Sequence, residues 1–543
     1  MSRMSKEALP EGSERILGRD AMRVNIAIGY AIANIIKTTL GPKGMDKMLV
    51  SDLGDIVITN DGATILEEMN VDHPAAKLMV EIAKTQDKEV GDGTTTSVVI
   101  AGNLFKKAAD LLEQNIHPTT VIKGYELASR KAVALLKELS HAVTLEDTEI
   151  LMKIAMVAVG SKGIGSEKEK EAICRMVVDA IKLVGEKKDG KFYIDSELIK
   201  IEKKAGGEIQ DTSLINGVVV DKEIVNSGMP KSIQNAKVAL LDSALEIEKT
   251  ETDAKIQITS PEQMESFLKQ EEKMLREMVD TIKKSGATVI FCQKGIDDLA
   301  QHYLAKDGIV AVRRVKKSDM DKLARATGAT IISSLDGLTE KELGSAGDVT
   351  EKKISGESMV FVEKCKHPKS VTVFVRGGTE HVVSEVERAV VDCIGAVSTA
   401  LEDGSYVIGG GAIEMSLSKG LSSYANEIGG REQLAIQAFA EALESIPRAL
   451  AENAGMDAID TLVSLKSKHN SKEGANFGVD VIKGKVDDLK AKGILEPTKV
   501  KKQAISSATE TARLVLRIDD IISSRGKSPA MPPGGMPGGM GGM

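Results

Sequence analysis

Aromatic residues are scarce in this sequence. Among 543 residues there are 8 Phe, 6 Tyr and no Trp, so aromatic side chains make up 3% of the chain. Hydrophobic residues nevertheless reach 42%, which is enough for large cores. These cores must therefore be built mainly from aliphatic side chains. A chain of this length is expected to divide into about three or four domains.

An excess of positive charge and long apolar runs are also missing. The 72 Lys and Arg residues are balanced by 80 Asp and Glu residues, which gives a net charge of −8 without a basic block. This balance argues against nucleic acid as a main partner. No apolar run approaches the roughly 18 residues of a transmembrane helix, so no membrane partner is expected. Residues 1–14 are polar and lack the apolar core of a signal peptide, which predicts a cytoplasmic protein.

Cysteine is rare as well. Cys174, Cys292, Cys365 and Cys393 form no Cys-x-x-Cys pair, and most of them lie in apolar or strand-like sequence. This pattern predicts buried free thiols in a reducing compartment. The alternative is a zinc site that uses Cys365, His367 and distant ligands.

The most informative stretch that is present is residues 91–96, with the sequence Gly-Asp-Gly-Thr-Thr-Thr. Its glycines let backbone N–H groups approach an anion, and an apolar run from Val98 predicts a helix directly after it. The N-terminus of a helix favours negative charge. Asp92 is compatible with an anion only if a cation neutralises it, and phosphate-bound Mg²⁺ would do so. The alternative is a Gly-Asp-Gly turn followed by a threonine cap.

Two earlier segments strengthen the interpretation as a phosphate site. Residues 40–44 (Leu-Gly-Pro-Lys-Gly) form a basic, glycine-rich turn, and residues 60–64 (Asn-Asp-Gly-Ala-Thr) repeat the combination of Asp, Gly and hydroxyl. Neither is a Walker A loop. The one Gly-x-x-x-x-Gly-Lys stretch, residues 185–191, has Phe192 where Ser or Thr is required, and no apolar strand leads into it. We interpret it as a solvated turn.

These three segments, in this order and spacing, resemble the nucleotide-site signatures of the chaperonin family. The similarity continues in residues 409–412 (Gly-Gly-Gly-Ala) and 493–500 (Gly-Ile-Leu-Glu-Pro-Thr-Lys-Val), and it covers nearly the whole chain. It implies an ATPase with ATP and Mg²⁺ as cofactors and with unfolded or partly folded proteins as partners. It also implies self-association into two stacked rings, usually of eight subunits each in the relevant branch.

The resemblance assigns catalytic roles to individual residues. Asp92 is the Mg²⁺ ligand, and Asp61 and Asp392 orient and deprotonate the attacking water. Lys162 contacts the γ-phosphate; the alternative is a cation at the C-terminus of a helix. An acidic residue on an amphipathic helix is usually solvated, but Asp392 has apolar neighbours, and a carboxylate in such surroundings needs a partner. The residues implied to cradle the phosphates are Leu40, Gly41, Pro42, Gly93, Thr94, Thr95 and Thr96.

A nucleoside pocket is implied by resemblance alone. Gly410 and Gly411 admit the purine, Ile494 packs on it, and Glu496 accepts hydrogen bonds from the ribose hydroxyls. Asn476 completes the pocket. The alternative for residues 493–497 is a plain turn.

Helical periodicity dominates both ends of the chain. Between them, short β-rich runs alternate with helical stretches from about residue 190, and a hairpin is expected at residues 48–58. The fold class is therefore mixed α/β and α, in several domains. Residues 528–543, rich in Gly, Met and Pro, are expected to form a disordered tail. The helices are expected over residues 13–40, 74–88, 95–114, 119–138, 379–402, 411–425, 430–453 and 457–468.

The family architecture places these elements in three domains. The mostly helical equatorial domain, built from both termini, takes residues 1–145 and 405–527. The small intermediate domain takes residues 146–215 and 370–404. The α/β apical domain takes residues 216–369 and carries a helical lid.

The segment from residue 243 to residue 285 indicates the branch of the family. Ser-Pro-Glu at 260–262 is a strong helix start. The apolar stripe of the following helix has Glu271 in its middle, so its first part is expected to project while its second part packs. Such a lid, at about residues 243–275, resembles that of group II (thermosome-like) chaperonins. The contact residues expected on the lid are Ile256, Ile258, Met264, Phe267 and Leu268.

We therefore expect an ATP-dependent chaperone that encloses non-native proteins in a double-ring cavity with a built-in lid. One rival is a small-molecule kinase, which should elute in gel filtration at the subunit mass of 57.9 kDa or as a dimer. A second rival is a structural ring protein that binds nucleotide without turnover. An ATPase assay tests this alternative, because such a protein would not hydrolyse ATP.

Overall fold

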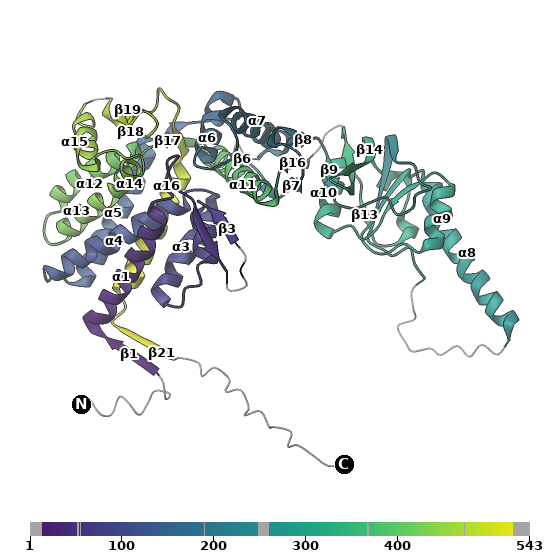
Figure 1. Ribbon diagram of the computed structural model, residues 1–543, viewed down its shortest axis with the longest axis horizontal. Helices are drawn as coiled ribbons and strands as arrows, with labels where there is room; N and C mark the ends of the chain where they lie inside the picture. Colours follow the sequence, from purple (N-terminus) through teal and green to yellow (C-terminus); the bar gives the residue numbers. More distant parts are fainter. Residues whose placement is uncertain are drawn as a thin grey trace, which may run out of the picture.

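The computed structural model describes residues 13–51, 54, 56–188, 191–247, 260–365, 369–471 and 473–524. A helical part that contains both ends of the described chain lies at one side, a smaller layer lies in the middle, and a sheet-rich part lies at the other side (Figure 1). Each part has its own large hydrophobic core. The mixed, multidomain fold class is thereby confirmed. The predicted lid contacts Ile256 and Ile258 and the predicted tail, residues 528–543, lie outside the described residues.

The helical part joins both ends of the sequence in one core. Helix α4 packs against α1 from the first residues and against α16 from the last. Aromatic contacts are few, and Tyr125 meets Phe439 edge to face with ring centroids 5.6 Å apart. The helices are α1 (Gly18–Lys37), α2 (Gly62–Glu68), α3 (Pro74–Val90), α4 (Thr94–Glu113), α5 (Pro118–Leu139), α12 (Ala412–Ile428), α13 (Glu432–Leu443), α14 (Ser445–Asn453), α15 (Ala458–Lys468) and α16 (Thr498–Leu516).

This helical part also contains several small sheets of two or three short strands. The strand β17 lies between β20 and β4, and both of its partners run antiparallel to it. The remaining strands form two-stranded antiparallel pairs, so the expected hairpin at residues 48–58 is present as β2 and β3. The strands are β1 (Ser13–Leu17), β2 (Lys47–Val50), β3 (Ile56–Thr59), β4 (His141–Ala142), β17 (Ser405–Ile408), β18 (Phe477–Asp480), β19 (Lys485–Asp488), β20 (Leu495–Pro497) and β21 (Asp520–Ser524).

Two predicted helices differ from the structure. The helix expected over residues 13–40 begins only at Gly18, because the preceding residues pair as β1 with β21, about 500 residues away in the sequence. The single helix expected over residues 430–453 is divided into α13 and α14. Pro447 lies in the first turn of α14, where its missing N–H group costs no helical hydrogen bond.

The middle part consists of three helices against a three-stranded sheet. Strand β16 lies between β7, which is parallel to it, and β8, which is antiparallel. The Gly-x-x-x-x-Gly-Lys stretch follows a helix, α7, and contains β5 and the first residue of β6, so it lacks the strand–loop–helix setting of a Walker A loop. The elements are α6 (Thr148–Gly160), α7 (Glu167–Val184), α11 (Glu380–Asp403), β5 (Glu186–Lys188), β6 (Lys191–Tyr193), β7 (Ile199–Ala205), β8 (Ser213–Ile215) and β16 (Val371–Gly377).

The third part is built on a mixed sheet with the strand order β12-β11-β10-β14-β15-β9, with β13 paired to β10. Helix α8 projects from its far end (Figure 1). Residues 261–274 of α8 are exposed, and burial begins at Leu275 and continues with Val279 and Ile282. The elements are β9 (Val218–Val220), β10 (Ser232–Leu241), α8 (Pro261–Ser285), β11 (Val289–Cys292), α9 (Asp298–Lys306), β12 (Val310–Val312), α10 (Lys317–Thr327), β13 (Ile331–Ile332), β14 (Gly344–Ile354) and β15 (Glu357–Glu363).

Two further features concern cysteines and membranes. All four cysteines are free and buried, as predicted. His367, the second ligand of the alternative zinc site, lies outside the described residues. None of the helices in the described ranges has both the length and the hydropathy that a membrane-spanning segment requires.

Candidate functional site

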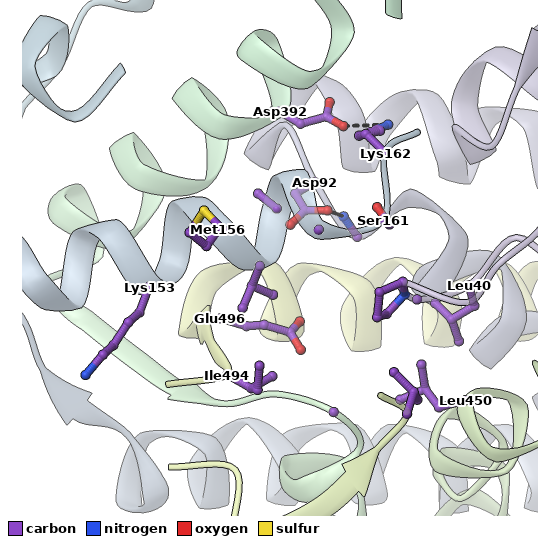
Figure 2. A pocket seen from close by; sticks show the side chains of 18 of the residues that line it. Leu40, Asp92, Lys153, Met156, Ser161, Lys162, Asp392, Leu450, Ile494 and Glu496 are labelled. Atoms are coloured by element: carbon purple, nitrogen blue, oxygen red, sulfur yellow. Dashed lines mark hydrogen bonds and ion pairs between the residues drawn. The ribbon is translucent and has the colours of Figure 1, made fainter. Parts of the chain in front are cut away.

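A cavity of about 1290 Å³ lies between the helical part and the middle part. The three glycine-rich segments, helix α6 and the turn before α12 form its walls (Figure 2). Of the predicted site residues in the nucleotide region, Asn476 alone does not line it; its carbonyl accepts a hydrogen bond from the N–H of Leu489, which does. The predicted residues that line the cavity are Leu40, Gly41, Pro42, Asp61, Asp92, Gly93, Thr94, Thr95, Thr96, Lys162, Asp392, Gly410, Gly411, Ile494 and Glu496.

The loop between α3 and α4 has the geometry of an anion cradle. Gly91 and Gly93 have φ angles of 67° and 77°, which favour glycine. A Cβ at Gly91 would lie 2.9 Å from the Cα of Gly395 in α11, so a side chain there would separate the two elements. The Gly93 cap of α4 supplies no side-chain hydrogen bond. The first N–H groups of α4 are therefore directed at the cavity without a side-chain cap.

A buried glutamine that the sequence analysis missed anchors this loop. The amide nitrogen of Gln86 donates to the carbonyl of Asp92 at 2.9 Å and to that of Val500 at 3.2 Å. The side chain is fully buried. It therefore ties the loop between α3 and α4 to the first turn of α16. Sequence alone gave no signal, because a glutamine within a helix is ordinarily solvated.

A buried lysine joins two of the predicted catalytic carboxylates. The Lys162 ammonium lies 2.7 Å from Asp392 Oδ2 and 3.6 Å from Asp61 Oδ1. Only 4% of the lysine side chain is exposed, against 16% for Asp61 and 14% for Asp392. Lys162 is therefore held inside the site by side chains from α11 and from the start of α2, rather than being a solvated cation at the end of α6.

The local backbone explains how Asp61 and Lys162 are placed. Asp61 is the N-cap of α2, and its Oδ2 accepts hydrogen bonds from the N–H and the hydroxyl of Thr64, each at 2.8 Å. Its other oxygen thereby faces Lys162. The amide of Asn60 donates to the Ser161 carbonyl, which holds the turn after α6 against this segment.

Burial changes the proton affinities of these groups. Burial raises the pKa of Asp392 to about 7, against the opposing effect of Lys162. Burial opposes the charged form of Lys162, but the carboxylates of Asp392 and Asp61 raise its pKa above the ordinary lysine value. Burial, with the nearby Glu496 carboxylate, raises the pKa of Asp92 to about 6. The site thus concentrates negative charge that a cation would neutralise.

The first glycine-rich segment is fixed by a helix from the other end of the sequence. Gly41 has a φ of 78°, and a Cβ there would lie 2.5 Å from Leu450 of α14. The Asn453 amide donates to the carbonyls of Lys37 and Leu40 at 3.0 and 2.9 Å. The contact of α14 with this loop was not foreseen, because it depends on the tertiary fold.

The opposite end of the cavity combines apolar side chains with two closely packed glycines. Gly410 and Gly411 have φ angles of 63° and 80°, and a Cβ at Gly411 would lie 2.7 Å from Pro447. The N–H of Gly409 donates to the Ile494 carbonyl at 2.9 Å, which brings the two predicted nucleoside segments together. Figure 2 shows Ile494 and Glu496 on the same side of the cavity, below Asp92. The apolar lining residues that the sequence analysis missed include Ile446, Leu450, Val479 and Leu489.

The residues present fit a nucleotide with its cation. One end supplies backbone donors at a helix start and the other supplies an apolar wall with glycines where a base would lie. Among the described residues, no group of three or more His, Cys, Asp and Glu side chains forms a preassembled metal site. A single carboxylate, Asp92, suits Mg²⁺, which is commonly held by one or two carboxylates together with substrate phosphates.

Comparison with known proteins decides the family. The model of the TCP-1/cpn60 chaperonin family matches residues 32–526. The chain belongs to this chaperonin family. The chaperonin is 61% identical over 516 residues to a thermosome subunit of Pyrococcus horikoshii, with 95% of this chain and 93% of that one covered. It is 57% identical over 534 residues to a thermosome subunit of Methanocaldococcus jannaschii, with 98% of each chain covered.

The group II, thermosome-like assignment made from the sequence is thereby confirmed. The chaperonin is an ATP-dependent chaperone with ATPase activity, which decides against both the small-molecule kinase and the ring protein without turnover. As a member of this family it binds nucleotide, acts on protein substrates and assembles into rings.

Proposed function

We propose that the cavity binds ATP with Mg²⁺ and that the chaperonin uses its hydrolysis to enclose non-native proteins. The observation that carries this proposal is the combination of a helix-start anion cradle with the buried Asp61–Lys162–Asp392 cluster in one cavity. Bound Mg²⁺ neutralises phosphate charge and orients the transferred phosphoryl group. The remaining tasks fall to side chains and backbone groups of the chain.

The proposed roles follow from position. Asp92 lies on the phosphate loop and is the metal ligand. The loop residues 93–96 and the turn at 40–42 hold the phosphates through N–H and hydroxyl donors. Asp392 accepts the proton of the attacking water, and Asp61 orients that water. Lys162 keeps both carboxylates in place. Its ammonium also supplies positive charge for the γ-phosphate.

The nucleoside would occupy the other end. Ile494 and the apolar wall contact the base, which lies beside the turn at Gly410 and Gly411. Glu496 accepts hydrogen bonds from the ribose hydroxyls. Asn476 contributes indirectly to this end of the cavity, because its carbonyl accepts a hydrogen bond from the N–H of Leu489, which lines the wall.

We further propose the three-domain division given above, with limits at residues 145, 215, 369 and 404. The separate hydrophobic cores of the helical, middle and sheet-rich parts support it. The exposed first half of α8, with Met264, Phe267 and Leu268, is part of the proposed lid and contact surface. The cytoplasmic location remains a prediction.

Assembly into two rings of eight subunits is the finer proposal. Support comes from the hairpin of β2 and β3, where Met48 is paired with Ile58 and Val50 with Ile56 on one exposed face. All four side chains are at least 48% exposed. An exposed apolar cluster of this kind usually marks a contact with another protein surface.

Electron microscopy and an ATPase assay on the purified protein test the proposal together. We expect end views with eight-fold symmetry, side views with two stacked rings, and ATP turnover that stops when Mg²⁺ is chelated. Rings of another symmetry would overturn the eight-subunit proposal alone. Turnover that continues without a divalent cation would overturn the proposed role of Asp92.

A further inference from the structure

One buried lysine of the cavity has no role in the mechanism given above. Lys501 lies in the first turn of α16, and only 5% of its side chain is exposed. Its ammonium lies 2.8 Å from Glu414 Oε1 and 2.5 Å from Glu496 Oε2. Glu414, on α12, is the most deeply buried of the three, with 2% of its side chain exposed. A buried charge requires a partner of this kind.

Two carboxylates surround this one lysine, although a single carboxylate is enough to neutralise it. Glu414 alone neutralises Lys501, and it does not line the cavity. Glu496 does line the cavity, with 17% of its side chain exposed. The arrangement therefore runs from a buried anion through a cation to an anion at the cavity wall.

Both oxygens of Glu496 are constrained. Oε2 accepts from Lys501, and Oε1 lies so close to Gly409 that a Cβ at that position would collide with it. The backbone of Glu496 is fixed as well, because it pairs with Val407 in the sheet of β17 and β20. The carboxylate is thus held from two sides, by the Lys501 ammonium and by the backbone at Gly409.

The same turn of α16 is also connected to the phosphate loop. The carbonyl of Val500, next to Lys501, accepts a hydrogen bond from Gln86, which also donates to the carbonyl of Asp92. The first turn of α16 therefore sets the distance between the proposed ribose acceptor and the proposed metal ligand.

We propose that Lys501 is a positioning residue that fixes the Glu496 carboxylate for the two ribose hydroxyls, and that it thereby determines the preference of the site for ribonucleotides. Glu414 holds Lys501 from the protein side. The proposal rests on the proposed role of Glu496 in nucleotide binding. A site with a preset acceptor discriminates against ligands that lack the hydroxyls, because such ligands offer it no hydrogen bonds in place of those it made to water.

The test compares the binding of Mg·ATP and Mg·2′,3′-dideoxy-ATP by calorimetry. In the unchanged protein we expect ATP to bind about 10- to 100-fold more tightly, the usual worth of hydrogen bonds to a charged group. In Lys501→Met we expect ATP binding to weaken about fivefold to tenfold and dideoxy-ATP binding to change less than about twofold. The ratio isolates the hydroxyls, because any general loss of positive charge near the phosphates affects both nucleotides.

Three variants serve as controls. Lys501→Arg should retain most of the ATP preference, because it keeps a buried cation. Glu414→Gln should also retain it, although it disturbs the same buried cluster. If Lys501→Met does not fold, the double variant Lys501→Met/Glu414→Gln removes the buried cation and its partner together and should show the same loss of preference.

The Glu496→Ala variant distinguishes a failure of the positioning role of Lys501 from a failure of the ribose-binding role of Glu496. If this variant loses the ATP preference but Lys501→Met keeps it, the positioning role is overturned and the role of Glu496 stands. If Glu496→Ala keeps the preference, both are overturned. Equal weakening of ATP and dideoxy-ATP in Lys501→Met, accompanied by the same effect in Glu414→Gln, would show a purely structural role for the cluster and also overturn the proposal.

Discussion

Asp392 combines an apolar position with a charge that the proposed chemistry needs. Its side chain is 14% exposed, and Lys162, 2.7 Å away, stabilises its charged form against the effect of burial. Because burial nevertheless raises its pKa to about 7, its basicity is near the range that suits a general base. The lysine in turn has Asp61 as a second partner.

Replacing Asp392 by Ala should separate binding from turnover. We expect Mg·ATP affinity to change little and the turnover rate to fall by about 10²–10⁴, which is the usual contribution of a positioned base. Steady-state ATPase kinetics and calorimetry measure the two quantities. Glu149→Gln is a matched control, because it changes an exposed carboxylate at another wall of the same cavity. Turnover at the unchanged rate would remove Asp392 from the mechanism.

The proposed catalytic residues could be singled out from the sequence only with the help of the family signatures. Asp392 has one physical signal of its own, its apolar neighbours, and the structure agrees with it. The sequence is compatible with Lys162 either in the site or as a cation at the end of a helix. Its ion pairs with two carboxylates distant in the sequence favour a place within the site. Gln86, Lys501 and Asn453 carried no signal, because their partners come from elements far away in the sequence.

At the level of elements, helices with a clear apolar periodicity were found near their true positions. The expected helices at 95–114 and 119–138 correspond to α4 and α5 with only small shifts at their ends. Errors occurred where long-range pairing overrides local preference. The clearest case is β1, which begins the predicted first helix but pairs with β21.

The hairpin of β2 and β3 allows a test of assembly at this scale. Met48→Lys combined with Ile56→Lys places two charges on its exposed apolar face, and we expect rings to give way to single subunits. Light scattering coupled to gel filtration measures the mass, and the melting temperature reports folding. Leu183→Lys, an exposed apolar position on α7, is the control and should leave the rings intact.

Two outcomes would contradict the proposal that the hairpin of β2 and β3 is a subunit contact. Intact rings in the Met48→Lys/Ile56→Lys variant, at an unchanged melting temperature, would show that this face is not a subunit contact. Loss of rings in the Leu183→Lys control would equally remove the special role of the hairpin.

For the whole molecule, the arrangement separates the proposed ATP site from the proposed client-contact surface. The cavity lies between the helical part and the middle part, and α8 projects from the opposite side of the sheet-rich part (Figure 1). Burial in α8 begins at Leu275, so the first half of the helix carries exposed apolar side chains, among them Met264, Phe267 and Leu268. Within one subunit, the middle part lies between these two ends (Figure 1).

The central claim is that ATP-driven closure of this projecting segment encloses a client. The most direct measurement deletes residues 245–270 and follows the protease sensitivity of a denatured client after ATP addition, with ATP consumption and ring assembly as controls. We expect ATP hydrolysis and rings to persist while the client remains protease-sensitive and does not refold. If the truncated protein still protects and refolds the client without an added cap, the segment is not a lid and the claim is wrong.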